Sequence, residues 1–193
     1  MDISTVKKNF HKKKDIGVYM NALLTRKIHI PFNKISKNIK ELLENLIKKQ
    51  IEGKCTIEGF IKPDSTNIIS YSSGILTANL VEFDVAFECL VCCPVEGMTI
   101  KCIVKNKTQA GIRALINDDV SPVVIYISRD HHYNNKLFNS IFNSTNDNEE
   151  IHIKVIGQRY ELNDEQVSVI GEIIEPKSEK GKKKGVLKKL VLK

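Results

Sequence analysis

The chain has 193 residues, of which 41% are hydrophobic and 27% are charged, and its formal net charge is +7. This composition is ordinary for a folded globular protein, and the length suits one large domain or two small ones. No stretch approaches the roughly 20 uninterrupted apolar residues that a membrane helix needs. No secretory signal is visible near the N-terminus, and the odd count of five cysteines favours a reducing intracellular compartment.

The positive charge is concentrated near the two ends of the sequence. Residues 176–193 hold eight lysines and one glutamate, and residues 1–15 hold five lysines and two aspartates. Residues 16–175 therefore hold 17 basic and 20 acidic residues, a net charge of −3. Lysine-rich arms attract nucleic-acid phosphates through counterion release without reading sequence. Two interpretations stay open for these arms, a nucleic-acid contact and a solvated disordered tail.

The first elements are a strand and a helix. From Ala22 to Ile30 the even positions are mostly apolar, which predicts a strand with one buried face that ends at Pro31. Ser36 or Asn38 is placed to cap a helix, through a side-chain oxygen that accepts from an N–H group of the first turn. An amphipathic helix of about four turns is predicted next, ending before Gly53. Its apolar positions are Ile35, Ile39, Leu42, Leu43, Leu46 and Ile47.

Most of the sequence from Ile51 to Glu175 has the alternation of strands. Strands are predicted at 51–62, with Ile57 on the apolar face, and at 68–71. The longest alternation follows, and it predicts one long strand with a buried face. The apolar positions of that strand are Val81, Phe83, Val85, Phe87, Cys89, Val91 and Cys93. Pro94 to Gly97 interrupts the pattern and is the predicted domain boundary.

Five further strands are predicted after this interruption, at 98–105, 112–116, 123–127, 151–156 and 167–174. The run from Val123 to Ile127 is typical of a strand buried on both faces. Residues 134–142, between the third and fourth strands, are predicted as a short helix or an irregular excursion. Five strands with an excursion at this point match the layout of an oligonucleotide-binding (OB) barrel, although the pattern alone does not separate it from other small barrels.

Three segments, in this order, carry a family resemblance. Ile51 to Thr56 follows a leucine-rich helix, Pro94 to Met98 leads on to Gly111, and Ile125 to Arg129 ends a strand. Together they resemble the stalk subunit of multisubunit DNA-dependent RNA polymerases, which is the seventh subunit of eukaryotic RNA polymerase II and the E-prime subunit of archaea. The resemblance spans about residues 18–175. Residues 71–74, 87–89, 91–94 and 129–132 look particularly like versions from large nucleocytoplasmic DNA viruses.

The resemblance implies an α+β protein with two domains. Residues 18–95 would form a truncated ribonucleoprotein-like domain, a helix on an antiparallel sheet, that docks on the polymerase core near the base of the clamp. Residues 96–175 would form a five-stranded OB-fold barrel that projects toward the RNA exit path. A basic N-terminal arm (1–17) and a lysine-rich disordered tail (176–193) would flank them.

The same resemblance implies partners and a location. Expected partners are RNA polymerase core subunits and single-stranded RNA, with no membrane. Because cellular stalk subunits pair with a smaller fourth subunit, a fourth-subunit-like stalk partner is a further candidate. The expected location is intracellular, with the polymerase complex. For a viral protein this means the host cytoplasm, the viral factory or the virion, and otherwise the nucleus.

Basic residues of the barrel and the tail are the candidate RNA contacts. Many barrels of this family carry an aromatic residue just after the second Gly, worth about 1–3 kcal/mol per stacked base. Here Ile112 and Arg113 follow Gly111 instead, and an arginine is able to stack on a base or bind phosphate. Strand alternation points three lysines outward, where a solvated strand face is the open alternative. The predicted RNA-binding residues are Lys101, Lys105, Lys107, Arg113, Lys182, Lys183 and Lys184.

Two clusters invite a metal or catalytic interpretation. Cys89, Cys92 and Cys93 suggest zinc, but side chains three apart on a strand point to opposite faces, so buried core cysteines are favoured. His131 and His132 are adjacent on an extended segment and therefore face apart, and no nucleophile is spaced to pair with them. No glycine-rich phosphate loop is present. We therefore expect no metal, no cofactor and no catalytic residue.

These observations predict a non-catalytic stalk subunit of a DNA-directed RNA polymerase that docks on the core enzyme and contacts emerging RNA. Two other classes stay open. One is a free-standing OB-fold RNA-binding protein, such as a translation or RNA-decay factor. The other is a structural zinc protein.

Overall fold

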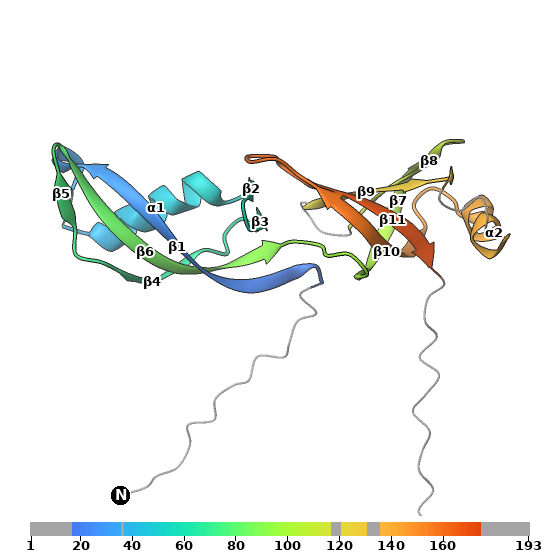
Figure 1. Cartoon of the computed structure of the whole chain (residues 1–193), viewed down its shortest axis with the longest axis horizontal. Helices are drawn as coiled ribbons and strands as arrows, with labels where there is room; N and C mark the ends of the chain where they lie inside the picture. Colours follow the sequence, from blue (N-terminus) through green and yellow to red (C-terminus); the bar gives the residue numbers. More distant parts are fainter. Residues whose placement is uncertain (1–16, 36, 117–120, 131–135, 175–193) are drawn as a thin grey trace, which may run out of the picture.

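Two β-sheets follow one another along an elongated molecule (Figure 1). The structure, a computed structural model, describes residues 17–35, 37–116, 121–130 and 136–174. In these residues the first sheet is antiparallel, with six strands and a helix on one face, and the second is a closed barrel of five strands. The predicted α+β class, a helix on an antiparallel sheet followed by a five-stranded barrel, is confirmed.

The first sheet is built around two long strands. β1 (Tyr19–Pro31) and β6 (Leu80–Cys92) pair antiparallel over their whole length. Three short strands line the other side of β6, namely β3 (Gly59–Ile61), β4 (Asn67–Tyr71) and β5 (Ile75–Thr77). β2 (Cys55–Thr56) pairs with β3. The alternation predicted for both long strands is confirmed, because the apolar positions of β6 are buried from Val81 to Val91.

Helix α1 (Ile39–Ile51) covers one face of this sheet, and η1 (Phe32–Lys34) is a short 3-10 helix before it. Leu43, Ile47 and Ile51 of α1 share a core with the inward residues of β1 and β6. Asn38 is the N-cap residue, as predicted, but the predicted capping hydrogen bond is wrong. The Asn38 side chain makes no such bond and its Nδ2 donates to Glu41 Oε2 over 2.6 Å instead.

One strand prediction in the first sheet is wrong. The single strand expected over 51–62 is the end of α1 followed by the β2–β3 hairpin, and Ile57 at the hairpin turn is 77% exposed. Gly59 explains the difference. Its φ is +128°, and a Cβ there would lie 2.5 Å from the Cys92 carbonyl oxygen, so this position needs glycine. The apolar residues from Ile51 to Ile61 have the alternation of one strand, but the turn before Gly59 divides them into a hairpin.

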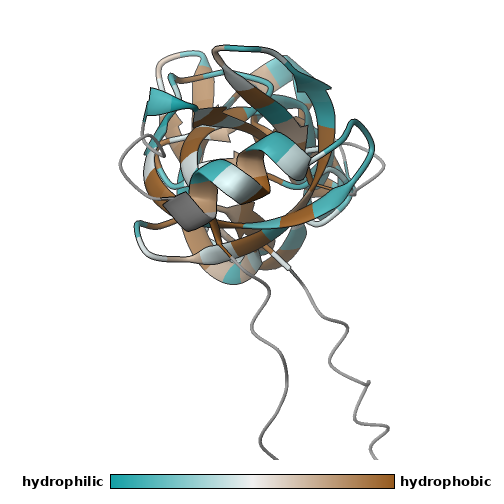
Figure 2. Ribbon diagram, turned by 90° about the vertical axis from the view of Figure 1, so that its right-hand side faces the viewer, coloured by the Kyte–Doolittle hydropathy of each residue, from teal (hydrophilic) through white to brown (hydrophobic). Residues whose placement is uncertain are grey.

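The barrel consists of β7 (Thr99–Lys107), β8 (Gly111–Leu115), β9 (Val123–Ser128), β10 (Glu150–Arg159) and β11 (Val167–Ile174). Its strand order is β7-β8-β9-β11-β10 and back to β7, with β9 and β11 parallel and the other pairs antiparallel. Helix α2 (Lys136–Ser144) lies between the third and fourth barrel strands, as an OB-fold layout requires. Figure 2 shows α2 across the end of the barrel, and Phe142 enters the barrel core.

The two sheets meet through shared packing and backbone hydrogen bonds. Tyr19, Cys55, Phe60 and Cys92 of the first sheet belong to the same core cluster as the barrel interior. The connection between β10 and β11 lies against β2, where Cys55 N donates to the Asp164 carbonyl (2.7 Å) and Asn163 N donates to the Cys55 carbonyl (2.9 Å). Tyr160 Oη donates to the Ile57 carbonyl over 3.1 Å.

An ion pair links β1 to the β2–β3 turn. The Arg26 guanidinium donates to Glu58 Oε2 over 2.5 Å, and Thr56 Oγ1 donates to the same oxygen over 2.9 Å. The hydrogen bond from Arg26 is the main reason that the pKa of the Glu58 carboxyl lies below its ordinary value, although partial burial opposes this shift. Folding therefore favours the ionised form of Glu58.

Glu58 should make the stability of the protein depend on pH. Because its pKa is lower in the folded state, its contribution is present above roughly pH 4 to 5 and is lost as the pH falls through the folded-state pKa. We expect Glu58→Gln to lower the free energy of unfolding at neutral pH by about 0.5–1.5 kcal/mol and to flatten its decline in acid, measured by urea denaturation.

The matched control is Glu161→Gln, which removes an ion pair with Arg159 whose side chains are 73% and 84% exposed. Such exposed pairs contribute little, so we expect a change below about 0.5 kcal/mol. If Glu58→Gln leaves the acid decline of stability unchanged, the ion pair does not contribute as described.

Candidate functional site

A row of four outward side chains crosses adjacent strands of the barrel. Strand pairing sets Asn106 of β7 opposite Arg113 of β8, Arg113 opposite Tyr126 of β9, and Tyr126 beside Ile170 of β11. Residues paired in this way share one face of the sheet, with Cβ atoms roughly 5 Å apart. The row therefore presents an amide, a guanidinium, an aromatic ring and an aliphatic side chain in sequence.

This row lines a hollow of about 360 Å³, here called the barrel hollow and defined by Asn106, Thr108, Gly111, Arg113, Tyr126 and Ile170. Tyr126 is 48% exposed and Ile170 is 46% exposed, so apolar surface is available in the hollow. None of the described residues that line it is acidic. Arg113 forms none of the ion pairs found among the described residues. An apolar surface with an aromatic ring and a guanidinium suits a nucleobase better than it suits a metal ion or a polar metabolite.

Two features keep the edge of the barrel hollow in place. A Cβ at Gly111 would lie 2.5 Å from the Ile127 carbonyl oxygen, so only glycine lets β8 approach β9 this closely. The Thr108 hydroxyl accepts from Gly111 N (3.2 Å) and donates to the Gly111 carbonyl (3.0 Å), which closes the β7–β8 turn. The turn beside Arg113 is therefore held by its own hydrogen bonds.

The aromatic residue of this site was not identified from sequence. The family pattern places an aromatic residue directly after the second Gly, whereas Tyr126 lies on the next strand, opposite Arg113. The expectation that 123–127 is buried on both faces is wrong at Tyr126 and right at Val123, Val124, Ile125 and Ile127. The sequence did contain one signal, because Tyr126, whose ring carries a polar hydroxyl, is the one non-aliphatic residue in the run from Val123 to Ile127.

Of the residues predicted to bind RNA, Arg113 alone lines the barrel hollow among those that the structure describes. Lys101 pairs with Glu150 Oε1 over 2.9 Å on the β7–β10 side of the barrel. Lys105 is exposed, in keeping with its outward position. Lys182, Lys183 and Lys184 lie outside the described residues.

Lys107 has a structural contact of its own. Its Nζ donates to the carbonyl oxygens of Asn143 (2.9 Å) and Thr145 (2.7 Å) and lies 5.7 Å from the centre of the Phe142 ring. These carbonyls belong to the C-terminal end of α2, where a cation is favoured by the helix dipole. The lysine therefore ties α2 to the barrel wall.

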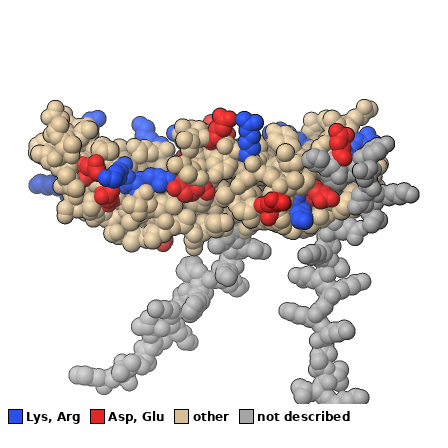
Figure 3. Space-filling view, viewed as in Figure 1, with Lys and Arg blue, Asp and Glu red and all other residues tan. Residues whose placement is uncertain are grey.

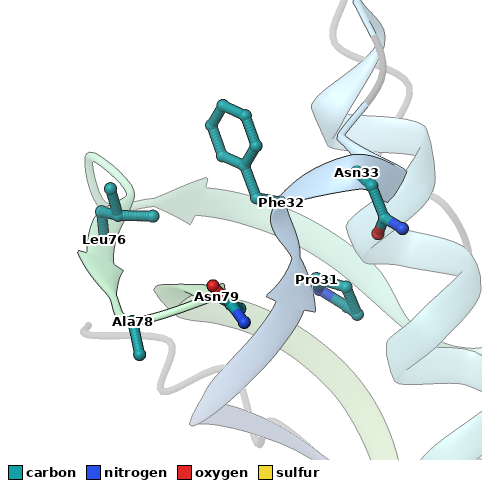
Figure 4. A pocket seen from close by; sticks show the side chains of 6 residues that line it. All are labelled: Pro31, Phe32, Asn33, Leu76, Ala78 and Asn79. Atoms are coloured by element: carbon teal, nitrogen blue, oxygen red, sulfur yellow. The ribbon is translucent and has the colours of Figure 1, made fainter.

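A second hollow lies at the opposite end of the molecule from the barrel, here called the tip hollow (Figure 4). It measures about 480 Å³ and is lined by Pro31, Phe32, Asn33, Leu76, Ala78 and Asn79. Figure 4 shows Phe32 and Leu76 on different sides of it, and these side chains are 66% and 63% exposed. Large apolar side chains clustered at an exposed end are typical of a protein-docking surface.

Charge is evenly mixed over the face of the molecule drawn in Figure 3, where lysine and arginine alternate with aspartate and glutamate. This agrees with the net charge of −3 for residues 16–175. No helix in the described residues has the length and apolar character needed to cross a bilayer. In the described region, any recognition of RNA would therefore depend on particular side chains more than on a broad positive field.

The cysteines of β6 diverge, as predicted. Cys89 packs in the core of the first sheet and Cys92 in the barrel core, and burial raises the pKa of the Cys89 thiol to about 11. The described residues contain no group of three or more histidine, cysteine or acidic side chains suited to hold a metal ion. His131 and His132 lie outside the described residues.

Comparison with known proteins gives one informative match. No family model matches the chain. The sequence is 25% identical over 172 residues to a protein of Acanthamoeba polyphaga mimivirus named "Putative DNA-directed RNA polymerase subunit L376". The match covers 82% of this chain and 83% of that protein, so it includes residues of both sheets.

The contact made by Lys107 leads to a stability prediction. We expect Lys107→Met to lower the free energy of unfolding by about 1–2 kcal/mol, because two helix-end carbonyls lose a charged donor. Lys105→Met is the matched control on the same strand, with an expected change within about 0.5 kcal/mol. Urea denaturation followed by circular dichroism measures both, and equal effects of the two substitutions would contradict the role of Lys107.

Proposed function

We propose that this protein is a non-catalytic stalk subunit of a DNA-directed RNA polymerase. The observation that carries the proposal is the match to a protein named as a polymerase subunit, which extends over both sheets. A helix-covered sheet followed by an OB-type barrel is also the arrangement expected from the resemblance to stalk subunits. The subunit would contribute binding surfaces to the enzyme and no catalytic group. It would work wherever the polymerase complex works inside the cell.

The first sheet, within residues 18–95, is the proposed anchor on the polymerase core. Its tip hollow exposes Phe32 and Leu76 at the end of the molecule farthest from the barrel. Burying a side chain of this size contributes roughly 1.5–3 kcal/mol, so a few such residues are enough to anchor an accessory subunit. Docking at this end would leave the barrel, residues 96–175, projecting from the enzyme.

β1 offers a separate surface for a stalk partner. In the described residues it pairs only with β6, so its other edge presents unpaired backbone donors and acceptors. Exposed edges of this kind accept an added strand from another chain. A fourth-subunit-like partner is the proposed occupant of this edge.

The barrel hollow is the proposed contact for single-stranded RNA. Tyr126 supplies the stacking surface that the sequence lacks directly after Gly111. Arg113 lies beside the ring, and the lysine-rich ends of the chain would add attraction to phosphates without sequence preference.

Co-purification tests the polymerase assignment. A tagged chain expressed in its native source should bring down the large polymerase subunits, identified by mass spectrometry. We expect Phe32→Glu to reduce their yield at least about tenfold, because it places a charge in the apolar tip. Leu162→Glu, at a residue 63% exposed on the β10–β11 connection, is the control and should leave the yield unchanged.

Failure of the unmodified chain to recover any large polymerase subunit would refute the assignment. Tight binding of RNA in that case would favour the alternative of a free-standing OB-fold RNA-binding protein. If the Phe32→Glu and Leu162→Glu variants both recover the large polymerase subunits in undiminished yield, docking through the tip hollow is refuted, but the polymerase assignment stands.

RNA binding by the barrel makes its own prediction. We expect Tyr126→Ala to weaken binding of single-stranded RNA about 5- to 150-fold in a fluorescence anisotropy titration, since one stacked base is lost. Tyr71→Ala removes a tyrosine that is 44% exposed on the first sheet and should have no effect on affinity. The same loss with both substitutions would place the RNA contact elsewhere.

A further inference from the structure

The barrel hollow has room for a single nucleotide. Its volume of about 360 Å³ is near the lower end of ligand pockets, which span roughly 300–1,000 Å³. Tyr126 stands in the middle of the row, with Ile170 on one side and Arg113 on the other. A base stacked on the Tyr126 ring would therefore contact an aliphatic wall at one edge and a guanidinium at the opposite edge.

Arg113 is the only charged side chain among the described residues that line the barrel hollow. It forms no ion pair with any described residue, so its guanidinium is available to a ligand. The Thr108 hydroxyl, in the β7–β8 turn, already forms hydrogen bonds with the backbone N–H and carbonyl of Gly111. The Ser128 hydroxyl, also in the lining, accepts from Asp130 N. Two polar groups of the row therefore face the hollow, the Asn106 amide with donors and an acceptor and the planar Arg113 guanidinium with five N–H donors and no acceptor.

A planar group of donors discriminates among the four bases. Guanine presents two adjacent acceptors, N7 and O6, which a guanidinium binds through two parallel hydrogen bonds. Adenine presents N7 beside an amino donor, which would face the donors of Arg113. Uracil offers a single carbonyl at the corresponding position and cytosine an amino group. Phosphate is the other natural ligand of arginine. Because Arg113 lies directly opposite Tyr126, a base stacked on the ring would have its edge, and not its phosphate, next to the guanidinium.

We propose that the barrel hollow selects guanine in single-stranded RNA, with Tyr126 stacking on the base and Arg113 donating to N7 and O6. The proposal rests on the RNA contact assigned to the barrel in the proposed function, and it is independent of docking to the polymerase. It names a base preference where the lysine-rich ends of the chain would give none.

The test compares short oligouridines that carry one central guanosine, adenosine or 7-deazaguanosine, titrated against the full chain by fluorescence anisotropy. We expect the guanosine oligonucleotide to bind about 5- to 150-fold more tightly than the adenosine one. The 7-deazaguanosine, which lacks the N7 acceptor, should lose most of this advantage. Raising the salt concentration should weaken all three while leaving their ratios unchanged, because base contacts release no counterions.

Arg113→Lys separates base recognition from charge. Lysine keeps the positive charge but lacks the planar fork and donates to N7 and O6 only as a point charge, so the preference for guanosine should become smaller while binding of plain oligouridine stays within about threefold. Arg159→Lys, at an exposed position of β10 outside the hollow, is the matched control and should keep the preference. Circular dichroism of both variants verifies that they fold.

Each other result overturns the proposal. A guanosine preference that is undiminished in Arg113→Lys would remove the arginine from base recognition. Equal affinity for all three oligonucleotides would show RNA binding without guanine selection. Absence of binding to every oligonucleotide at low salt would remove the RNA contact as well, and recovery of polymerase subunits in the co-purification would still decide the docking part of the proposed function.

Discussion

The shared packing between the first sheet and the barrel is the constraint on which the rest of the structure depends. Phe60 and Cys92, from strands of the first sheet, are fully buried in the cluster that fills the barrel. Gly59 makes this possible, since any side chain there would collide with the Cys92 carbonyl. The β10–β11 connection closes the same junction from the other side through its hydrogen bonds with Cys55. Close-packed protein interiors have few voids and low compressibility, so a displacement of one sheet is transmitted to the other. The two sheets are therefore expected to move together.

A stiff junction would allow the two ends of the molecule to have the separate roles proposed for them. The tip hollow and the barrel hollow lie at opposite ends of the chain's long axis, and neither shares a residue with the other. A partner bound at the tip would hold the barrel at a fixed distance and orientation. In many OB folds the connection between the last two strands flanks the ligand. Here that connection contacts β2 at the junction, so the proposed RNA contact uses the β7–β8 turn and the row through Tyr126 instead.

Sequence periodicity was sufficient for those elements whose side chains alternate without interruption. β1, β6 and α1 could be predicted because burial of one face imposes a regular period of apolar residues. The β2–β3 hairpin could not, since Ile57 continues the apolar alternation across a turn that exists only through the backbone of Gly59. The tip hollow and the row through Tyr126 depend on strand register, which brings together residues far apart in sequence. Asn106 and Ile170 have no local pattern that would connect them.

Under the proposed function, affinity for RNA and selectivity among bases would come from different parts of the chain. Residues 16–175 carry a net charge of −3, so long-range attraction of a phosphate chain must come chiefly from the lysine-rich ends. Such attraction is the same for every base and weakens steeply with salt. The barrel row would contribute the opposite kind of interaction, short-ranged and dependent on the shape of the ligand. Tyr126 of β9 is 48% exposed between buried neighbours and lines the barrel hollow together with Arg113 and Ile170. The grouping of a ring, a guanidinium and an aliphatic side chain in one hollow, more than the exposure of the ring, is what supports the proposed RNA contact on this face of the barrel.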